Sequence, residues 1–161
     1  MLNINATQVT SENFSKYGTY YNMKNGTKDV ISTEGEGFSD VRTTHPLIDT
    51  VGNLGFTLGS PLPAKIHTME RHLHTQEALF CLSDPFVITV AKSDENDYPS
   101  TESAEAFIVR PGEVVVLKKG VWHDACHGLK DEVYYYWMAL EREEIVNEWI
   151  VIVPEPVLVD I

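Results

Sequence analysis

Short β-prone runs separated by turn residues dominate the chain from residue 52 onward, and this pattern most limits its possible folds. The runs are rich in Val, Ile, Phe, Tyr and Trp and are bounded by Gly, Pro, Ser and Asp. They recur about every 8 to 14 residues with no long helical period between them. Such spacing is typical of an all-β sandwich or barrel. The predicted strands lie within residues 54–60, 64–72, 77–83, 85–92, 105–111, 113–119, 133–141 and 148–154.

The segments outside these runs are expected to be less regular. Residues 10–17 predict one short helix with Thr10 as N-cap, a Val9–Phe14 hydrophobic staple and a stop at Gly18. Asn25-Gly26 predicts a hairpin turn, and residues 92–105 predict a polar loop. The tail 154–161 is Pro-rich, so we expect it along a sheet edge or against a partner subunit rather than in a central strand.

Length and charge restrict the classes of protein that fit. The 161 residues suit a single domain, with the barrel over about residues 52–153. A formal net charge of −12 disfavours binding to nucleic acid or to an anionic membrane surface, because both are negatively charged. Two cysteines make no disulfide framework, and no signal pattern or membrane-spanning apolar run is present. We therefore expect a cytoplasmic protein with reduced thiols.

The segment 67–78, "HTMERHLHTQEA", concentrates three of the six histidines together with two glutamates. In a strand, alternate residues share a face, which groups Glu70, His72 and His74 and places His67 and Arg71 opposite. A turn after His74 would then bring Glu77 back alongside. Carboxylate and imidazole groups at this spacing suit a divalent transition metal.

A fourth ligand is expected from residues 110–128, "RPGEVVVLKKGVWHDACHG". Pro111-Gly112 predicts a turn into a strand, and Lys119-Gly120 predicts a turn out of it. His123 follows on the next strand. The simpler alternatives are that each histidine is a hydrogen-bonded strand residue, and that the glutamates pair with Arg71 or Lys65 on a solvated rim.

Together the two segments resemble the paired motifs of the cupin superfamily. Glu70-x-His72-x4-Glu77 resembles the first motif, with Glu in the place of its first His. Gly112, Gly120 and His123 resemble the second, with Lys118 where Pro is common. The resemblance implies a double-stranded β-helix, or jelly roll, with the motif residues inside the barrel mouth.

A narrower resemblance is to the ureidoglycolate lyase family, over roughly residues 11–142. It is carried by three groups of residues: Glu12, Phe14, Tyr17 and Gly18; Ile66, His67, Glu70, Arg71 and His72; Val121, Trp122 and His123. The sequence departs from the family in three places. Glu77 stands where Gln is common, residues 56–60 lack the usual Asn-Arg pair, and Asp124 stands where a second His often follows.

The lyase resemblance implies an enzyme that releases urea and glyoxylate from ureidoglycolate or acts on a related small hydroxy acid. On this hypothesis a metal such as Zn, Mn, Ni or Fe is held by Glu70, His72, Glu77 and His123. His74, His127 and Glu77 are the candidates for acid–base catalysis. The candidates for binding the substrate carboxylate and walling the pocket are Lys65, Arg71, Lys118, Trp122 and Tyr136.

Two other functions fit the same motifs. One is a metal-dependent sugar or sugar-acid isomerase or epimerase, and the other is a cupin that binds a small ligand without catalysis. Some cupins also hold no metal. A homodimer is expected from the resemblance alone.

Overall fold

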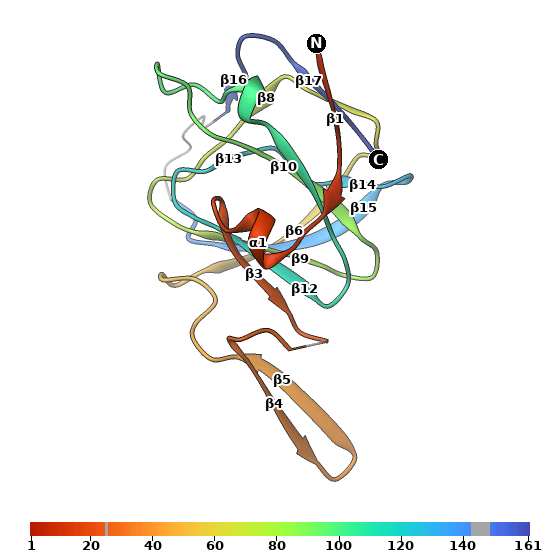
Figure 1. The fold of residues 1–161 in the computed structure, drawn as a ribbon. Coiled ribbons are helices and arrows are strands. Elements are labelled where there is room, and N and C mark those ends of the chain that lie inside the picture. Colours follow the sequence, from red (N-terminus) through yellow and green to blue (C-terminus); the bar gives the residue numbers. More distant parts are fainter. Residues whose placement is uncertain (25, 143–148) are drawn as a thin grey trace.

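The computed structural model describes residues 1–24, 26–142 and 149–161, and within them the protein is built almost entirely of strands. Its helical elements there are α1 (Ser11–Phe14) and the 3-10 turn η1 (Thr101–Ser103). Two main sheets pack face to face, and a smaller third sheet covers the second (Figure 1). The expected all-β architecture of packed sheets with a short N-terminal helix is confirmed.

The first main sheet has five strands in the order β3-β12-β9-β15-β6, and all neighbours are antiparallel. The chain positions of these strands interleave, as in a jelly roll rather than a simple meander. Their bounds are β3 (Gly18–Asn22), β12 (Glu113–Leu117), β9 (Glu77–Cys81), β15 (Val133–Ala139) and β6 (Asn53–Gly59).

The second main sheet is centred on β10 (Phe86–Ala91). On one side β10 pairs with β11 (Glu105–Val109), which pairs in parallel with β2 (Thr7–Gln8). On its other side it pairs with β13 (Trp122–His123) and β14 (His127–Gly128). The third sheet has the order β1 (Leu2–Asn5), β17 (Val157–Asp160) and β7 (Ala64–Ile66).

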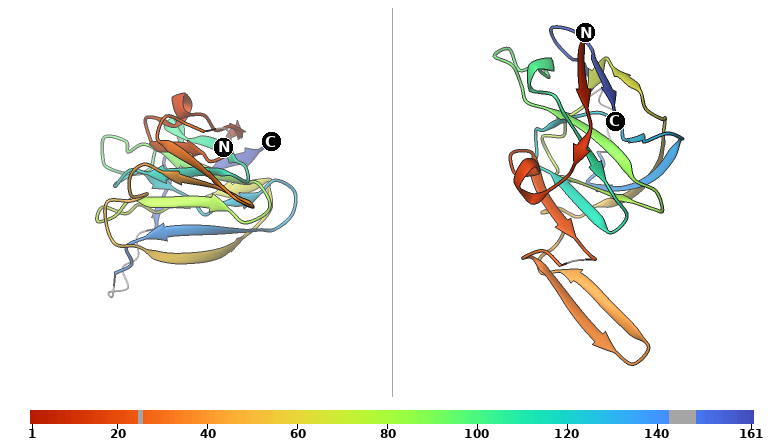
Figure 2. Two further views of the ribbon diagram at one scale, coloured as in Figure 1. Left: turned by 90° about the horizontal axis from the view of Figure 1, so that it is seen from below. Right: turned by 45° about the vertical axis from the view of Figure 1, so that its right-hand side comes forward.

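Strand β10 explains why the sequence "FVITVA" is apolar without alternation. Phe86, Ile88 and Val90 belong to the core between the two main sheets, while Val87 and Ala91 belong to the core against the third sheet. Both faces of β10 are therefore buried, which favours a continuous hydrophobic run. The stacked layers are visible in the left view of Figure 2.

The N-terminal helix is shorter than the sequence predicts. Thr10 caps it as expected, through a reciprocal pair of hydrogen bonds with Asn13. The helix ends at Phe14 because the chain must turn to bring Tyr17 into the core and to start β3 at Gly18. A β-carbon on Gly18 would lie 1.8 Å from the carbonyl oxygen of Val116, so only glycine fits this close approach.

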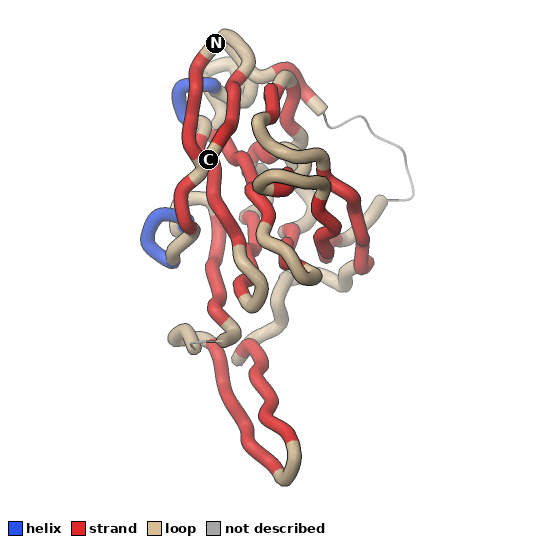
Figure 3. Tube along the Cα trace, turned by 90° about the vertical axis from the view of Figure 1, so that its right-hand side faces the viewer, coloured by secondary structure: helices blue, strands red, loops and turns tan. Residues whose placement is uncertain are grey.

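Of two expectations about irregular segments, the one for the C-terminal tail was wrong, and the one for the Asn25-Gly26 turn lies partly outside the described residues. The C-terminal tail provides β17, the middle strand of the third sheet, because Pro154 and Pro156 precede the strand rather than interrupt it. The predicted hairpin turn at Asn25-Gly26 includes a position outside the described residues. A hairpin does form nearby, from β4 (Val30–Gly35) and β5 (Phe38–Thr43), and it projects from the body (Figure 3).

The remaining pair is β8 (Thr68–Met69) with β16 (Ile150–Val151). No helix in the described ranges is long and apolar enough to cross a membrane.

Candidate active site

The candidate site forms where the two motif segments meet. Glu70 and His123 exchange two backbone hydrogen bonds of 2.8 Å, and the Gly120 amide donates to the carbonyl oxygen of His72 at 2.8 Å. The expected long strand over 64–72 is instead divided into β7 and β8, and residues 71–76 are irregular. Residues 71–76 are held by the hydrogen bond from Gly120 to His72. The positions of their side chains therefore depend on this contact and not on the alternation of a strand.

Four predicted ligands converge at this junction. Ligand atoms of Glu70, His72 and His123 lie within 4.8 Å of one another. The Oε2 atom of Glu77, at the start of β9, lies 2.9 Å from His123 Nε2 and 3.3 Å from His72 Nε2. Glu70 Oε1 lies 3.8 Å from His123 Nε2. The turn after His74 thus returns Glu77 to the group, as the spacing predicts.

These donors fit a metal ion. His123 Nδ1 lies 3.0 Å from the carbonyl oxygen of Val121, a contact that makes Nδ1 the protonated nitrogen and leaves a lone pair on Nε2. His123 Nε2 and Glu77 Oε2 are buried and lack a partner at hydrogen-bonding angles, although they face each other at 2.9 Å. Two electron-rich atoms at that distance require a proton or a cation beside them. Two imidazoles and two carboxylates suit a divalent transition metal.

Electrostatics within the group favours ionised side chains. Burial raises the pKa of Glu77, but contacts with His123 and then His72 outweigh it and lower the pKa to about 2. Burial lowers the pKa of His123, but Glu77 and Glu70 outweigh it and the net shift is upward. The group therefore holds ionised carboxylate inside the protein, which is the state that binds a metal.

The ligand group opens into a pocket of about 220 Å³ between the two main sheets. Its wall combines aromatic rings with acidic groups, and no Lys or Arg is among the described residues that line it. These residues are Thr57, Glu70, His72, Glu77, Leu79, His123, Asp124, Ala125, Cys126, Tyr135, Trp137, Ala139, Glu141 and Trp149.

The three cations predicted to bind a substrate carboxylate are elsewhere. Arg71 forms a bidentate ion pair with Asp97, and its guanidinium lies 4.3 Å from the centre of the Trp122 ring. Lys118 donates to the carbonyl oxygen of Ser15 at 2.8 Å. Lys65 is exposed on β7 in the third sheet. None of the three lines the pocket, so their positions do not support the prediction that they bind the substrate carboxylate.

The two predicted aromatic wall residues face away from the pocket. Trp122 belongs to the core against the third sheet, since it alternates with His123 on β13. Tyr136 packs on Phe56 and Phe80 on the outer face of the five-stranded sheet. Its neighbours Tyr135 and Trp137 line the pocket instead. The pairing register of β15 with β9 identifies which aromatic residues face inward. Trp137 pairs with Leu79 and therefore lies on the same face of the sheet as Glu77.

The two predicted spare histidines also lie outside the pocket lining. His74 Nε2 bonds the carbonyl oxygen of Leu140 at 2.8 Å. His127 is buried behind Asp124, with Nε2 2.9 Å from Asp124 Oδ2. Asp124, which the sequence marks only as a departure from the family, lines the pocket itself.

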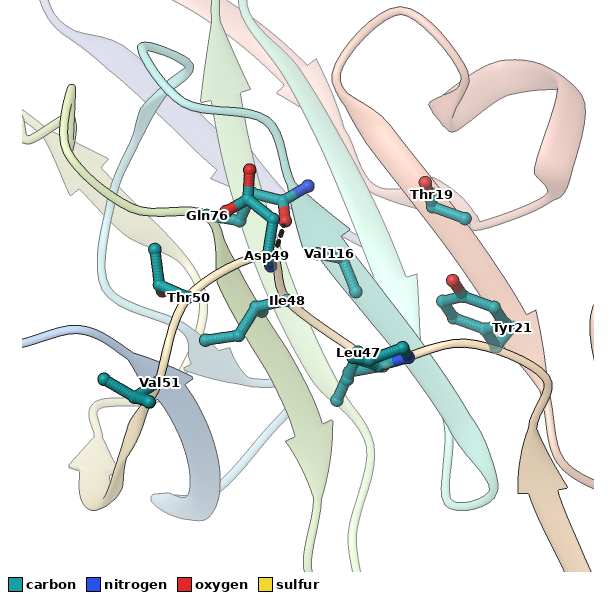
Figure 4. Close-up of a pocket in the computed structure, with 10 residues that line it drawn as sticks. Thr19, Tyr21, Leu47, Ile48, Asp49, Thr50, Val51, Gln76 and Val116 are labelled. Atoms are coloured by element: carbon teal, nitrogen blue, oxygen red, sulfur yellow. Dashed lines mark hydrogen bonds between the residues drawn. The ribbon is translucent and has the colours of Figure 1, made fainter.

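A second pocket, of about 560 Å³, lies on the opposite face of the five-stranded sheet (Figure 4). Residues 46–51 pass over β3 and β12 there, and the Asp49 amide donates to Gln76 Oε1 at 2.8 Å. Among the described lining residues the one carboxylate is that of Asp49, which pairs with Lys119 at 3.0 Å. None of the described residues that line this pocket is a histidine or a cysteine, so it offers far less chemistry than the first.

Comparison with known proteins agrees with the motifs. A family model described as Ureidoglycolate lyase matches residues 1–160. The chain belongs to the ureidoglycolate lyase family. A search of curated proteins found no match.

Solved structures of low sequence identity that resemble this family member include several sugar epimerases. One is dTDP-4-dehydrorhamnose 3,5-epimerase from Bacillus anthracis str. Ames, at 7% identity and TM-score 0.48, covering 76% of this chain and 75% of that chain. Another is the 4-keto-6-deoxy sugar epimerase NovW of Streptomyces spheroides, at 11% identity and TM-score 0.47. That match covers 86% of this chain and 72% of that chain. A third is RmlC from Streptococcus suis, at 9% identity and TM-score 0.44. That match covers 59% of this chain but only 46% of that chain.

Proposed function

We propose that the protein is a metal-assisted carbon–nitrogen lyase that releases urea and glyoxylate from ureidoglycolate. The observation that carries the proposal is the convergence of Glu70, His72, Glu77 and His123 in one pocket. Family membership supports the choice of reaction.

The reaction is an elimination from a carbinolamide. A base takes the proton of the carbinol hydroxyl, the carbon–nitrogen bond breaks, and its electron pair is protonated on the departing urea nitrogen. The substrate is a small anion with a hydroxyl beside its carboxylate. The site must therefore bind a negative charge and take up a proton.

The residues divide these tasks. Glu70, His72 and His123, with Glu77, would hold a divalent metal, whose charge binds an α-hydroxy carboxylate and lowers the pKa of its hydroxyl. Since no Lys or Arg is in the described lining, this charge is what offsets the pocket's carboxylates when an anion enters. Glu77 is the one predicted acid–base residue that lines the pocket.

The test is urea release from ureidoglycolate by purified protein, before and after chelator treatment. We expect turnover that chelator abolishes and added metal restores. Glu70→Gln keeps the size of the side chain but removes the charge of a candidate metal ligand, and should lower turnover by about 10²-fold or more. Asp84→Asn is an exposed control that should leave the rate unchanged. Turnover of sugar acids without any urea release would instead favour the epimerase alternative.

Two further sequence expectations remain predictions. The small-ligand-binding alternative predicts metal-dependent binding of ureidoglycolate with no product. The expected cytoplasmic location is the second.

A further inference from the structure

Tyr135 brings a buried hydroxyl group to the pocket that holds the candidate ligands. The side chain is 5% exposed, and its ring packs on Phe86 with the two ring centres 5.6 Å apart. Its hydroxyl oxygen accepts a hydrogen bond from the backbone amide of Cys126 at 3.3 Å. A buried donor without an acceptor costs about 1–3 kcal/mol, so the hydroxyl proton of Tyr135 must be directed at something.

The neighbouring groups direct this proton into the pocket. An indole N–H can only donate, and Trp137 Nε1 donates to Thr57 Oγ1 at 3.1 Å. The Thr57 hydroxyl donates in turn to the oxygen of Tyr135. That oxygen thus accepts from Thr57 as well as from the Cys126 amide, and among the residues that the structure describes none accepts the proton of Tyr135 itself.

The phenol of Tyr135 keeps its proton at physiological pH. Burial raises the pKa of Tyr135, and the proximity of Cys126 and Glu77 raises it further. The hydrogen bonds from the Cys126 amide and from Thr57 lower the pKa, but the net shift is well upward. Tyr135 is therefore a hydrogen-bond donor to the pocket and not a base.

We propose that Tyr135 donates a hydrogen bond to the ureido oxygen of the substrate and is a catalytic residue of the lyase. The inference rests on the proposed function, which places the carboxylate and hydroxyl of ureidoglycolate at the ligand group. The ureido oxygen is the acceptor that then remains. When the carbon–nitrogen bond breaks, its electron pair is shared between the ureido nitrogen and this oxygen until the nitrogen is protonated. A donor at the oxygen stabilises that developing charge.

Two small acids test the binding role, because each carries one end of the substrate. N-carbamoylglycine has the ureido group but lacks the carbinol hydroxyl, so it binds without turnover, and glycolate is the hydroxy acid without the ureido group. By calorimetry, Tyr135→Phe should bind N-carbamoylglycine about tenfold more weakly than the wild type and glycolate equally well. Tyr134→Phe removes an exposed hydroxyl on the outer face and should bind both acids as the wild type does.

Unchanged affinity of Tyr135→Phe for N-carbamoylglycine, or no binding of that acid by the wild type, would overturn the proposal. If Tyr135→Phe does not fold, a comparison on the wild type decides. N-thiocarbamoylglycine has sulfur, a weaker acceptor, in place of the ureido oxygen and should bind several-fold more weakly than N-carbamoylglycine. Equal or tighter binding of the sulfur compound would overturn the proposal.

Turnover separates this inference from the proposed function. Tyr135→Phe should release urea about 10²-fold more slowly than the wild type, because a donor to developing charge is lost. An unchanged rate in Tyr135→Phe overturns the catalytic role of Tyr135 and leaves the proposed function standing. A wild type that releases no urea, but whose affinity for N-carbamoylglycine depends on Tyr135, contradicts the proposed function and supports the binding role.

Discussion

His123 has the most constrained environment of the candidate ligands, since it is only 4% exposed and its Nδ1 is already hydrogen-bonded. We expect protein purified without chelator to contain about one transition metal per chain by elemental analysis. His123→Ala and His72→Ala should lose it, because each removes one imidazole donor. His67→Ala, an exposed histidine outside the pocket lining, is the control and should keep the metal. Metal retained in both ligand variants would contradict the assignment.

The two cysteines are expected to be unreactive, although Cys126 lines the pocket. Burial raises the pKa of Cys81 to about 12 and raises that of Cys126 well above its ordinary value. The reactive thiolate of Cys81 is then only ~10⁻⁴ of the total at pH 8. Iodoacetamide labelling at pH 8 should be far slower than for free glutathione and should speed up only on unfolding. Rapid labelling of the native protein would contradict this prediction.

Residue types and their spacing in the sequence were sufficient to predict the four candidate metal ligands, but not which aromatic residues line the pocket. Glu70, His72, Glu77 and His123 are recognisable because rare residue types recur at motif spacing. Tyr136 and its neighbours are all aromatic, so composition cannot choose which of them faces inward. The pairing register of β15 with β9 makes that choice.

Among the elements, the turn at Gly120 connects the two halves of the site. Gly120 has a φ of +83° and donates its amide to His72, so it both reverses the chain and holds the ligand loop. Gly120→Ala should reduce the free energy of unfolding by about 1–2 kcal/mol because L-residues disfavour this conformation. It should also reduce metal content, measured as above.

Gly37 provides the matched control for this turn. It has a similar φ of +81° but lies in the β4–β5 hairpin, where nothing lies within 4 Å of an added β-carbon. Gly37→Ala introduces the same backbone strain without contact to the ligand loop, so metal content should not change. Equal loss of metal in both variants would show that the Gly120 turn has no special role.

The β4–β5 hairpin is predicted to be dispensable for the fold. It projects from the body, and Phe38 near its tip is 62% exposed (Figure 3). The Thr44 amide donates to the carbonyl oxygen of Asp29 at 3.0 Å, so the two ends already lie together. Replacing residues 30–43 with a short Gly-Ser linker should change the melting temperature by no more than about 4 °C. A larger loss would mean that the hairpin packs on something in solution.

At the scale of the molecule, the outer face of the five-stranded sheet is an exposed apolar surface on β6 and β15. Phe56 is 51% exposed and stacks on Tyr134, and Leu54 and Leu58 flank it. β6 is an edge strand without charged residues. Such a surface and edge favour association with a second copy, despite the net charge of −12.

The predicted homodimer is therefore tested at this surface. Light scattering after size exclusion should give twice the chain mass of 18.1 kDa for the wild type. Phe56→Glu should give the monomer, because it places a charge in the centre of the apolar surface. Leu82→Glu, at an exposed position outside this face, should remain dimeric. A monomeric wild type would contradict the prediction.

Sequence alone predicted the all-β class, the approximate positions of most strands after residue 52 and the four candidate ligands, because these depend on local propensity and on motif spacing. It misplaced the C-terminal tail, since prolines exclude a strand only where they interrupt it. The sequence did not predict that β17 lies between β1 and β7, that Arg71 and Lys118 form their contacts away from the pocket, or that Asp124 lines the pocket. Those outcomes depend on register and on contacts between segments far apart in the chain. A one-residue shift in register exchanges the inner and outer faces of a strand, and local sequence does not encode that choice.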